Sequence, residues 1–110
     1  EKGLSFLLEN SSWRNLTTLN LSASIIYDNQ KVPSFDKNES WTELKVLDLS
    51  ANHLTDKTAL ELSKNTAWNK LEKLKLGGSL IKAEGARYLI NRWPNLKFDK
   101  QFSWNIKYHG

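Results

Sequence analysis

The side chains that most often do chemistry are few in this sequence and far apart. It has two histidines, His53 and His109, and no cysteine. A nucleophilic dyad or triad needs a histidine beside a serine or cysteine and a carboxylate, and neither histidine has such a pattern around it. We expect both to be solvated residues. The sequence therefore predicts no catalytic residues and a protein that is not an enzyme.

Two other segments resemble ligand sites only superficially. The acidic residues Asp28, Asp36 and Glu39 lack the regular alternation of a calcium-binding loop. The pair Gly77-Gly78 lacks the spacing and the lysine of a phosphate-binding loop, and we expect it to relieve crowding in a turn. We therefore expect no metal, no cofactor and no small-molecule substrate.

The strands and helices that would position any functional residue are predicted from a sequence pattern that recurs along the chain. Trp13, Trp41, Trp68 and Trp93 are each followed by a leucine three residues later, at spacings of 28, 27 and 25 residues. Three of these leucines open a ladder of the form Leu-x-x-Leu-x-Leu, at 16–21, 44–49 and 71–76. Period-two alternation puts the last two leucines on one face of a short strand. A fixed period of this length predicts stacked repeats whose strands pair in parallel.

The segments between ladders have room for helices. We expect a helix over 57–64 that begins after a Thr55-Asp56 cap, buries Ala59 and Leu62, and ends at Asn65. A second helix is expected over 83–91, with Ala86, Leu89 and Ile90 facing inward. We also expect all four repeated tryptophans to pack in the core between helices and sheet.

These residues resemble the leucine-rich repeat family, and within it the ribonuclease-inhibitor-like subclass. The consensus Leu-x-x-Leu-x-Leu-x-x-Asn-x-Leu is matched in full by the second copy, through Leu44, Leu47, Leu49, Asn52 and Leu54. The segment 84–89 is similar to the helix start of that subclass. The resemblance covers roughly residues 3–98. It implies an α/β solenoid, a short right-handed horseshoe arc with a parallel sheet on the concave face and helices on the convex face, and a protein-binding role.

We expect a single domain, 1–110. Three of its segments depart from the repeat pattern. Residues 3–10 align with the expected helix at 58–65, so residues 1–12 are either an N-terminal helix that acts as a cap or part of a longer array whose earlier strand is missing. The return over 27–40 contains Pro33 and is expected to be irregular, held by Val32 and Phe35. Residues 96–110 are expected to form a C-terminal cap. Their apolar residues at even positions predict β-structure, and an aromatic edge that recruits a partner is the alternative.

Strand alternation also predicts a binding surface. The outward positions of the three ladders would form the concave face. They are Thr18, Asn20, Ser22, Val46, Asp48, Ser50, Lys73, Lys75 and Gly77. Since tryptophan and tyrosine are missing from this set, we expect recognition of a partner protein through charge.

Charge is unevenly distributed along the chain. Residues 1–55 carry five basic and seven acidic side chains, whereas residues 56–110 carry eleven and five. The alternative function is therefore binding of nucleic acid or an anionic surface by the basic half, and a further alternative is substrate recruitment within a larger enzyme or adaptor. That basic set is Lys70, Lys73, Lys75, Lys82, Arg87, Arg92, Lys97 and Lys100. No apolar run is long enough to span a membrane, and we expect a cytoplasmic or intracellular protein, with a bacterial effector delivered to a host cell as one case.

Overall fold

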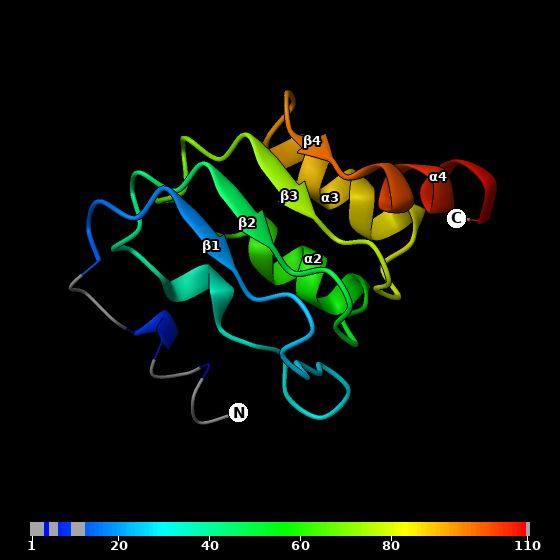
Figure 1. Cartoon of the computed structure of the whole chain (residues 1–110), viewed down its shortest axis with the longest axis horizontal. Helices are drawn as coiled ribbons and strands as arrows, with labels where there is room; N and C mark the ends of the chain where they lie inside the picture. The colour runs from blue at the N-terminus through cyan, green and yellow to red at the C-terminus, as the bar shows by residue number, and fades with distance from the viewer. Residues whose placement is uncertain (1–3, 5–6, 10–12, 110) are drawn as a thin grey trace.

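The computed structural model of this chain describes Leu4, residues 7–9 and residues 13–109. Within those residues the chain forms a mixed α/β structure with one four-stranded parallel sheet, ordered β1-β2-β3-β4 along the sequence (Figure 1). This confirms the predicted parallel pairing of the three ladders. The elements are β1 (Thr18–Asn20), the 3-10 helix η1 (Phe35–Lys37), β2 (Val46–Asp48), α2 (Asp56–Ser63), β3 (Lys73–Lys75), α3 (Ala83–Arg92), β4 (Lys97–Phe98) and α4 (Lys100–His109).

The register brings like positions of successive ladders side by side. Leu19 pairs with Leu47, Leu47 with Leu74, and Leu74 with Phe98. These central side chains point into one hydrophobic core, where Leu47 and Leu74 have no exposed surface. Leucines at the same height on neighbouring strands therefore form a continuous apolar row, because each strand repeats the same alternation.

Helices α2 and α3 pack against each other and against the inward side of the sheet (Figure 1). Thr55 caps α2 by accepting a hydrogen bond from the Lys57 backbone N–H, as predicted. The predicted inward residues Ala59, Leu62, Ala86 and Leu89 are buried. The prediction was wrong for Ile90, which is 45% exposed. The buried face of α3 consists of Gly85, Ala86 and Leu89. The helix surface that faces the core is therefore too narrow to include Ile90.

Buried asparagines connect the returns to one another. Asn38 and Asn65 each stand three residues before a tryptophan, and the Oδ1 atom of each accepts a hydrogen bond from that tryptophan's backbone N–H. The Nδ2 atom of Asn65 donates to the carbonyl oxygens of Phe35 and Asn38, one unit earlier. Polar groups that would be costly to bury alone are thereby satisfied across neighbouring units.

Three of the four repeated tryptophans are in the core, as expected. Trp41 and Trp68 are fully buried and stack with ring centroids 5.9 Å apart, and Trp93 is 5% exposed. The expectation was wrong for Trp13, which is 44% exposed. Trp13 lies at the β1 end of the sheet, where the described residues supply no further strand to pack on it.

The return between β1 and β2 is irregular, as predicted. Its only regular element among the described residues is η1, and Phe35 is fully buried there in edge contact with Trp68. Val32 is only half-buried. The predicted N-terminal segment lies largely outside the described residues, since residues 1–3, 5–6 and 10–12 are not among them. Leu8 is buried, and its carbonyl oxygen accepts a hydrogen bond from Asn38.

The C-terminal segment 96–110 is mostly helix, so the prediction of β-structure is met only by the two residues of β4 and was wrong from Lys100 onward. After the two residues of β4, α4 runs from Lys100 to His109. Apolar residues at every second position include pairs four apart, and such pairs share one face of a helix. Phe102 is buried and Ile106 packs against the core, while Trp104 and Tyr108 are exposed on another side of α4.

No helix among the described residues has the length and apolar character needed to cross a membrane.

Candidate binding face of the sheet

The predicted site residues on the strands lie together on the side of the sheet that faces away from α2 and α3. We call this the outer sheet face and define it by Thr18, Asn20, Val46, Asp48, Lys73 and Lys75. The register sets them in two rows, Thr18 beside Val46 beside Lys73, and Asn20 beside Asp48 beside Lys75. Thr18 and Asn20 are exposed and the other four are half-buried. The face is therefore accessible across three strands.

The strand ends repeat a small hydrogen-bonded motif. Asn20 Oδ1 accepts bonds from the backbone N–H and the hydroxyl of Ser22, and Asp48 Oδ1 does the same for Ser50. Both serines are half-buried. Because these bonds fix the side chains of Asn20 and Asp48, the strand ends present a rigid polar edge to a ligand.

Gly77 was wrongly included in the predicted contact surface, because it is buried. A Cβ atom at this position would lie 2.5 Å from Asp99 Oδ2 and 2.6 Å from Gln101 Oε1, so these two side chains cover it. Asp99 is held there by accepting a hydrogen bond from the Leu76 backbone N–H at 2.8 Å. Beyond Lys75, the sheet is thus covered by Asp99, just after β4, and by Gln101 in the first turn of α4.

Two lysines that the sequence analysis did not include in the predicted concave binding surface, Lys45 and Lys97, also belong to this region, although Lys97 was named in the basic set of the alternative function. Lys97 extends the first row, since it is the register partner of Lys73. Lys45 and Lys97 also line a hollow of about 790 Å³ beside the starts of β2, β3 and β4. The signal for Lys97 was present, because a fourth tryptophan opens a fourth copy of the ladder at residue 93.

Positive charge dominates this hollow. Its charged lining residues are Glu43, Glu72, Lys45, Lys70, Lys73 and Lys97. Lys70 is neutralised by Glu43, with Nζ and Oε1 2.7 Å apart. A second ion pair joins Lys64 to Glu61, on and just after α2, and neither pair involves Lys45, Lys73 or Lys97. Lys45, Lys73 and Lys97 therefore have no acidic partner within the described part of the chain.

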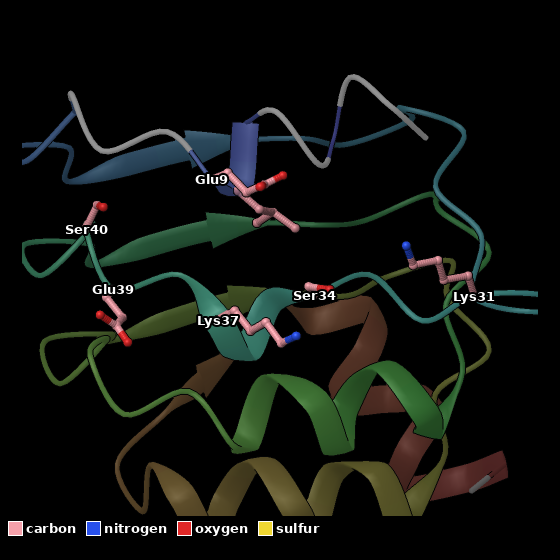
Figure 2. A pocket seen from close by; sticks show the side chains of 7 residues that line it. Glu9, Lys31, Ser34, Lys37, Glu39 and Ser40 are labelled. Carbon is pink, nitrogen blue, oxygen red and sulfur yellow. The ribbon is translucent and has the colours of Figure 1, made fainter.

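Two further hollows are less suited to a ligand. The one in Figure 2, about 520 Å³, lies between Leu8, Glu9 and the irregular return, and its side chains Lys31, Ser34 and Lys37 follow one another along that return. Glu9 and Glu39 mix acidic groups among these lysines. The other, about 730 Å³, lies at the β1 edge and is lined by Trp13, Arg14, Asn15, Leu16 and Leu19. The first hollow therefore has no surplus of either charge, and the second combines apolar side chains with Arg14 and Asn15.

The remaining chemically interesting residues have structural surroundings. His53 is exposed and stacks on Tyr27 at 5.1 Å. Asp28 is buried, and its Oδ2 accepts bonds from the Thr55 backbone N–H and from the hydroxyls of Thr55 and Thr58, which ties it to the start of α2. Among the residues that the structure describes, no three His, Asp or Glu side chains gather closely enough to hold a metal ion. The side chain of His109 lies outside the description.

The basic residues of the alternative function are not gathered on one surface. Lys82 precedes α3 and Arg87 lies on it, on the helical side of the sheet. Arg92 has a structural role, because its guanidinium donates hydrogen bonds to the Asn65 carbonyl oxygen and to Asn69 Oδ1. Only Lys73, Lys75 and Lys97 of this set share the outer strand positions.

Comparisons with known proteins gave no relative: no protein-family model matches the chain, and no curated protein matches it.

Proposed function

We propose that the chain is a short leucine-rich-repeat solenoid of the ribonuclease-inhibitor-like kind, and that it binds another protein on its outer sheet face without enzyme activity of its own. The in-register ladders support the solenoid, as does Asn52, whose amide donates to the carbonyl oxygens of Leu21, Leu49 and Ser50. In such a repeat, each unit buries its apolar face only by stacking on a neighbour.

One observation carries the binding role. The sheet is packed by helices on its inward side, while its outward side presents rigid, varied and accessible polar side chains on successive strands. Outward positions can vary freely without disturbing the leucine core, so they are where a partner's chemistry would be encoded. Recruitment of substrates to a larger enzyme or adaptor would be one use of the same surface.

Site-specific photo-cross-linking tests this proposal. A photoreactive amino acid is placed singly at Asn20 or Lys73 on the outer sheet face, and at Lys57 or Arg87 on the helices as matched exposed controls. After irradiation in an extract of the source cells, adducts are identified by mass spectrometry. We expect one discrete protein adduct from the outer positions and none from the helical positions.

The captured protein is then purified, and its affinity for the chain is measured with and without charge reversal at Lys73 and Lys75. Weaker binding of the double variant supports the proposal. Adducts from the helical positions only, or equal affinity of wild type and double variant, would show that the outer sheet face is not the docking surface.

A further inference from the structure

We propose that Lys73 and Lys97 form a carboxylate-binding pair that recognises an acidic segment of the partner protein. This inference rests on the proposed protein-binding role of the outer sheet face and specifies the partner's chemistry. Lys73 and Lys97 are direct register partners on β3 and β4. Neighbouring strands lie about 4.8 Å apart, so two lysines at one height reach the same ligand group.

Few acidic side chains lie near Lys73 and Lys97. The other neighbour of Lys73 along the row is Val46, which carries none. The adjoining hollow contains Lys45 and one acidic residue that is not ion-paired, Glu72, since Glu43 is bound to Lys70. The ammonium groups of Lys45, Lys73 and Lys97 therefore share this region with one carboxylate that is not ion-paired. A ligand that carries carboxylates would balance the excess positive charge.

Lys75 is in a different situation from this lysine pair. Its register partner is Asp48, and the backbone N–H of the next residue, Leu76, is bound by Asp99. Carboxylates already flank Lys75 on both sides. We therefore assign acid recognition to Lys73 and Lys97, with Lys45 beside them, and a lesser part to Lys75.

An acidic peptide fits this surface better than a nucleic acid does. Glu43, Glu72 and Asp48 lie on or beside the same face and would repel a continuous chain of phosphates. The outer strand positions named above also offer no aromatic ring on which a base could stack. A peptide can place carboxylates opposite Lys73 and Lys97 and neutral residues opposite the acids.

The test uses a fluorescein-labelled 12-residue peptide that alternates glutamate and serine, and the same peptide with glutamine in place of glutamate. Fluorescence anisotropy at low salt measures the affinity of the full chain for each. We expect the glutamate peptide to bind more tightly, and the Lys73→Glu/Lys97→Glu variant to lose about tenfold in affinity, the effect of two partly exposed ion pairs. Lys73→Arg should bind like wild type.

The matched control is Lys57→Glu/Arg87→Glu, which changes the net charge equally but on the helices. Its affinity should stay close to that of wild type, and circular dichroism should show all variants folded. Equal binding of the two peptides by wild type, or an equal loss in both double variants, would overturn the inference. Tighter binding of a single-stranded DNA or RNA 12-mer than of the peptide would also overturn it. Outer-face cross-links that persist in any of these cases would leave the proposed protein-binding role intact.

Discussion

Asn52 connects two neighbouring strand units through one buried amide. Besides the three bonds donated by Nδ2, its Oδ1 accepts the backbone N–H groups of Ser24 and Ile26. The residue is 2% exposed. A single side chain thus satisfies backbone groups of the preceding unit, at 21–26, and of its own unit, at 49–50, which a smaller side chain could not reach.

Substitution Asn52→Ala should lower the free energy of unfolding by about 2–4 kcal/mol, because several buried backbone groups lose their partner at once. Urea unfolding followed by circular dichroism measures this. The control Asn91→Ala, at an exposed position of α3, should change the free energy by no more than about 0.5 kcal/mol. If Asn52→Ala lowers the free energy of unfolding as little as the control does, the Asn52 amide does not stabilise these turns.

Tyr88 makes a local contact that responds to pH. Its hydroxyl donates a hydrogen bond to Glu84 Oε1 at 3.1 Å, and this bond, together with the negative charge of Glu84, raises the pKa of Tyr88 above its usual 10.0. The folded state holds the phenol proton more tightly than the unfolded state does. The contact therefore adds stability below pH 10, and that contribution is lost as the pH rises through the raised pKa.

Carbon-13 NMR of the Tyr88 ring carbon that bears the hydroxyl, recorded from pH 8 to pH 12, measures its titration midpoint. In Glu84→Gln the midpoint should move down toward 10.0, since both the strong acceptor and the charge are removed. An unchanged midpoint would show that the Glu84 carboxylate does not contact the hydroxyl in solution.

At the scale of elements, close approach of α2 and α3 depends on Gly85. A Cβ atom there would lie 2.7 Å from Ile81 Cγ2 and 3.0 Å from Ala59 Cβ. Alanine is the better helix former by about 1 kcal/mol, so intrinsic propensity alone predicts that Gly85→Ala stabilises the protein. The crowded contact predicts the opposite, at a cost of about 1–3 kcal/mol.

We expect Gly85→Ala to be net destabilising, by about 1 kcal/mol, in thermal and urea unfolding. Asn91→Ala, which changes an exposed residue of the same helix, serves again as the reference for the effect of alanine itself. A stabilised Gly85→Ala variant would mean that the two helices separate easily, and the tight packing between them would be contradicted.

The sequence predicted the elements whose signals are local. The α2 and α3 helices follow from a cap at Thr55 and from apolar residues three apart, and the strands follow from leucine alternation. Helix α4 could not be predicted in the same way, because apolar residues at even positions satisfy both a strand and one helix face. Its choice of helix depends on the core pocket that receives Phe102, which is a long-range property.

The candidate site was predictable to the same extent. The outward positions of β1, β2 and β3 follow from alternation, and the structure places them on one face. The burial of Gly77 was not predictable, because the residues that cover it, Asp99 and Gln101, come from the segment after β4. The alternation of inward and outward residues within one strand does not indicate whether a distant segment of the chain covers an outward position.

On the scale of the whole molecule, burial is uneven across the sheet. Leu44, Leu47 and Leu49 of the second ladder have no exposed surface, whereas Leu16, Leu19 and Leu21 of the first are only partly buried. The backbone hydrogen bonds are of similar length, 2.8 Å from Leu21 N to the Asp48 carbonyl oxygen and 2.9 Å from Leu49 N to that of Lys75. The two ladders thus differ in side-chain packing more than in backbone pairing.

Native-state hydrogen exchange should therefore be graded along the sheet. We expect the Leu49 amide to exchange at least about tenfold more slowly than the Leu21 amide, since local opening is easier where fewer apolar contacts are lost. Heteronuclear NMR after transfer to deuterated water measures both rates. Equal rates would show that the sheet opens only as one cooperative unit.

The stacked indoles of Trp41 and Trp68 give the protein an optical reporter of its own. Their planes differ by 11°, and each ring comes from a different repeat unit. Chromophores this close share their electronic excitation, and to the extent that their transition moments point in different directions within the two ring planes, the ultraviolet circular dichroism of the native chain contains a coupled pair of bands that neither ring produces alone. That spectral feature would disappear as soon as the two units part, which allows their separation to be timed without any added dye.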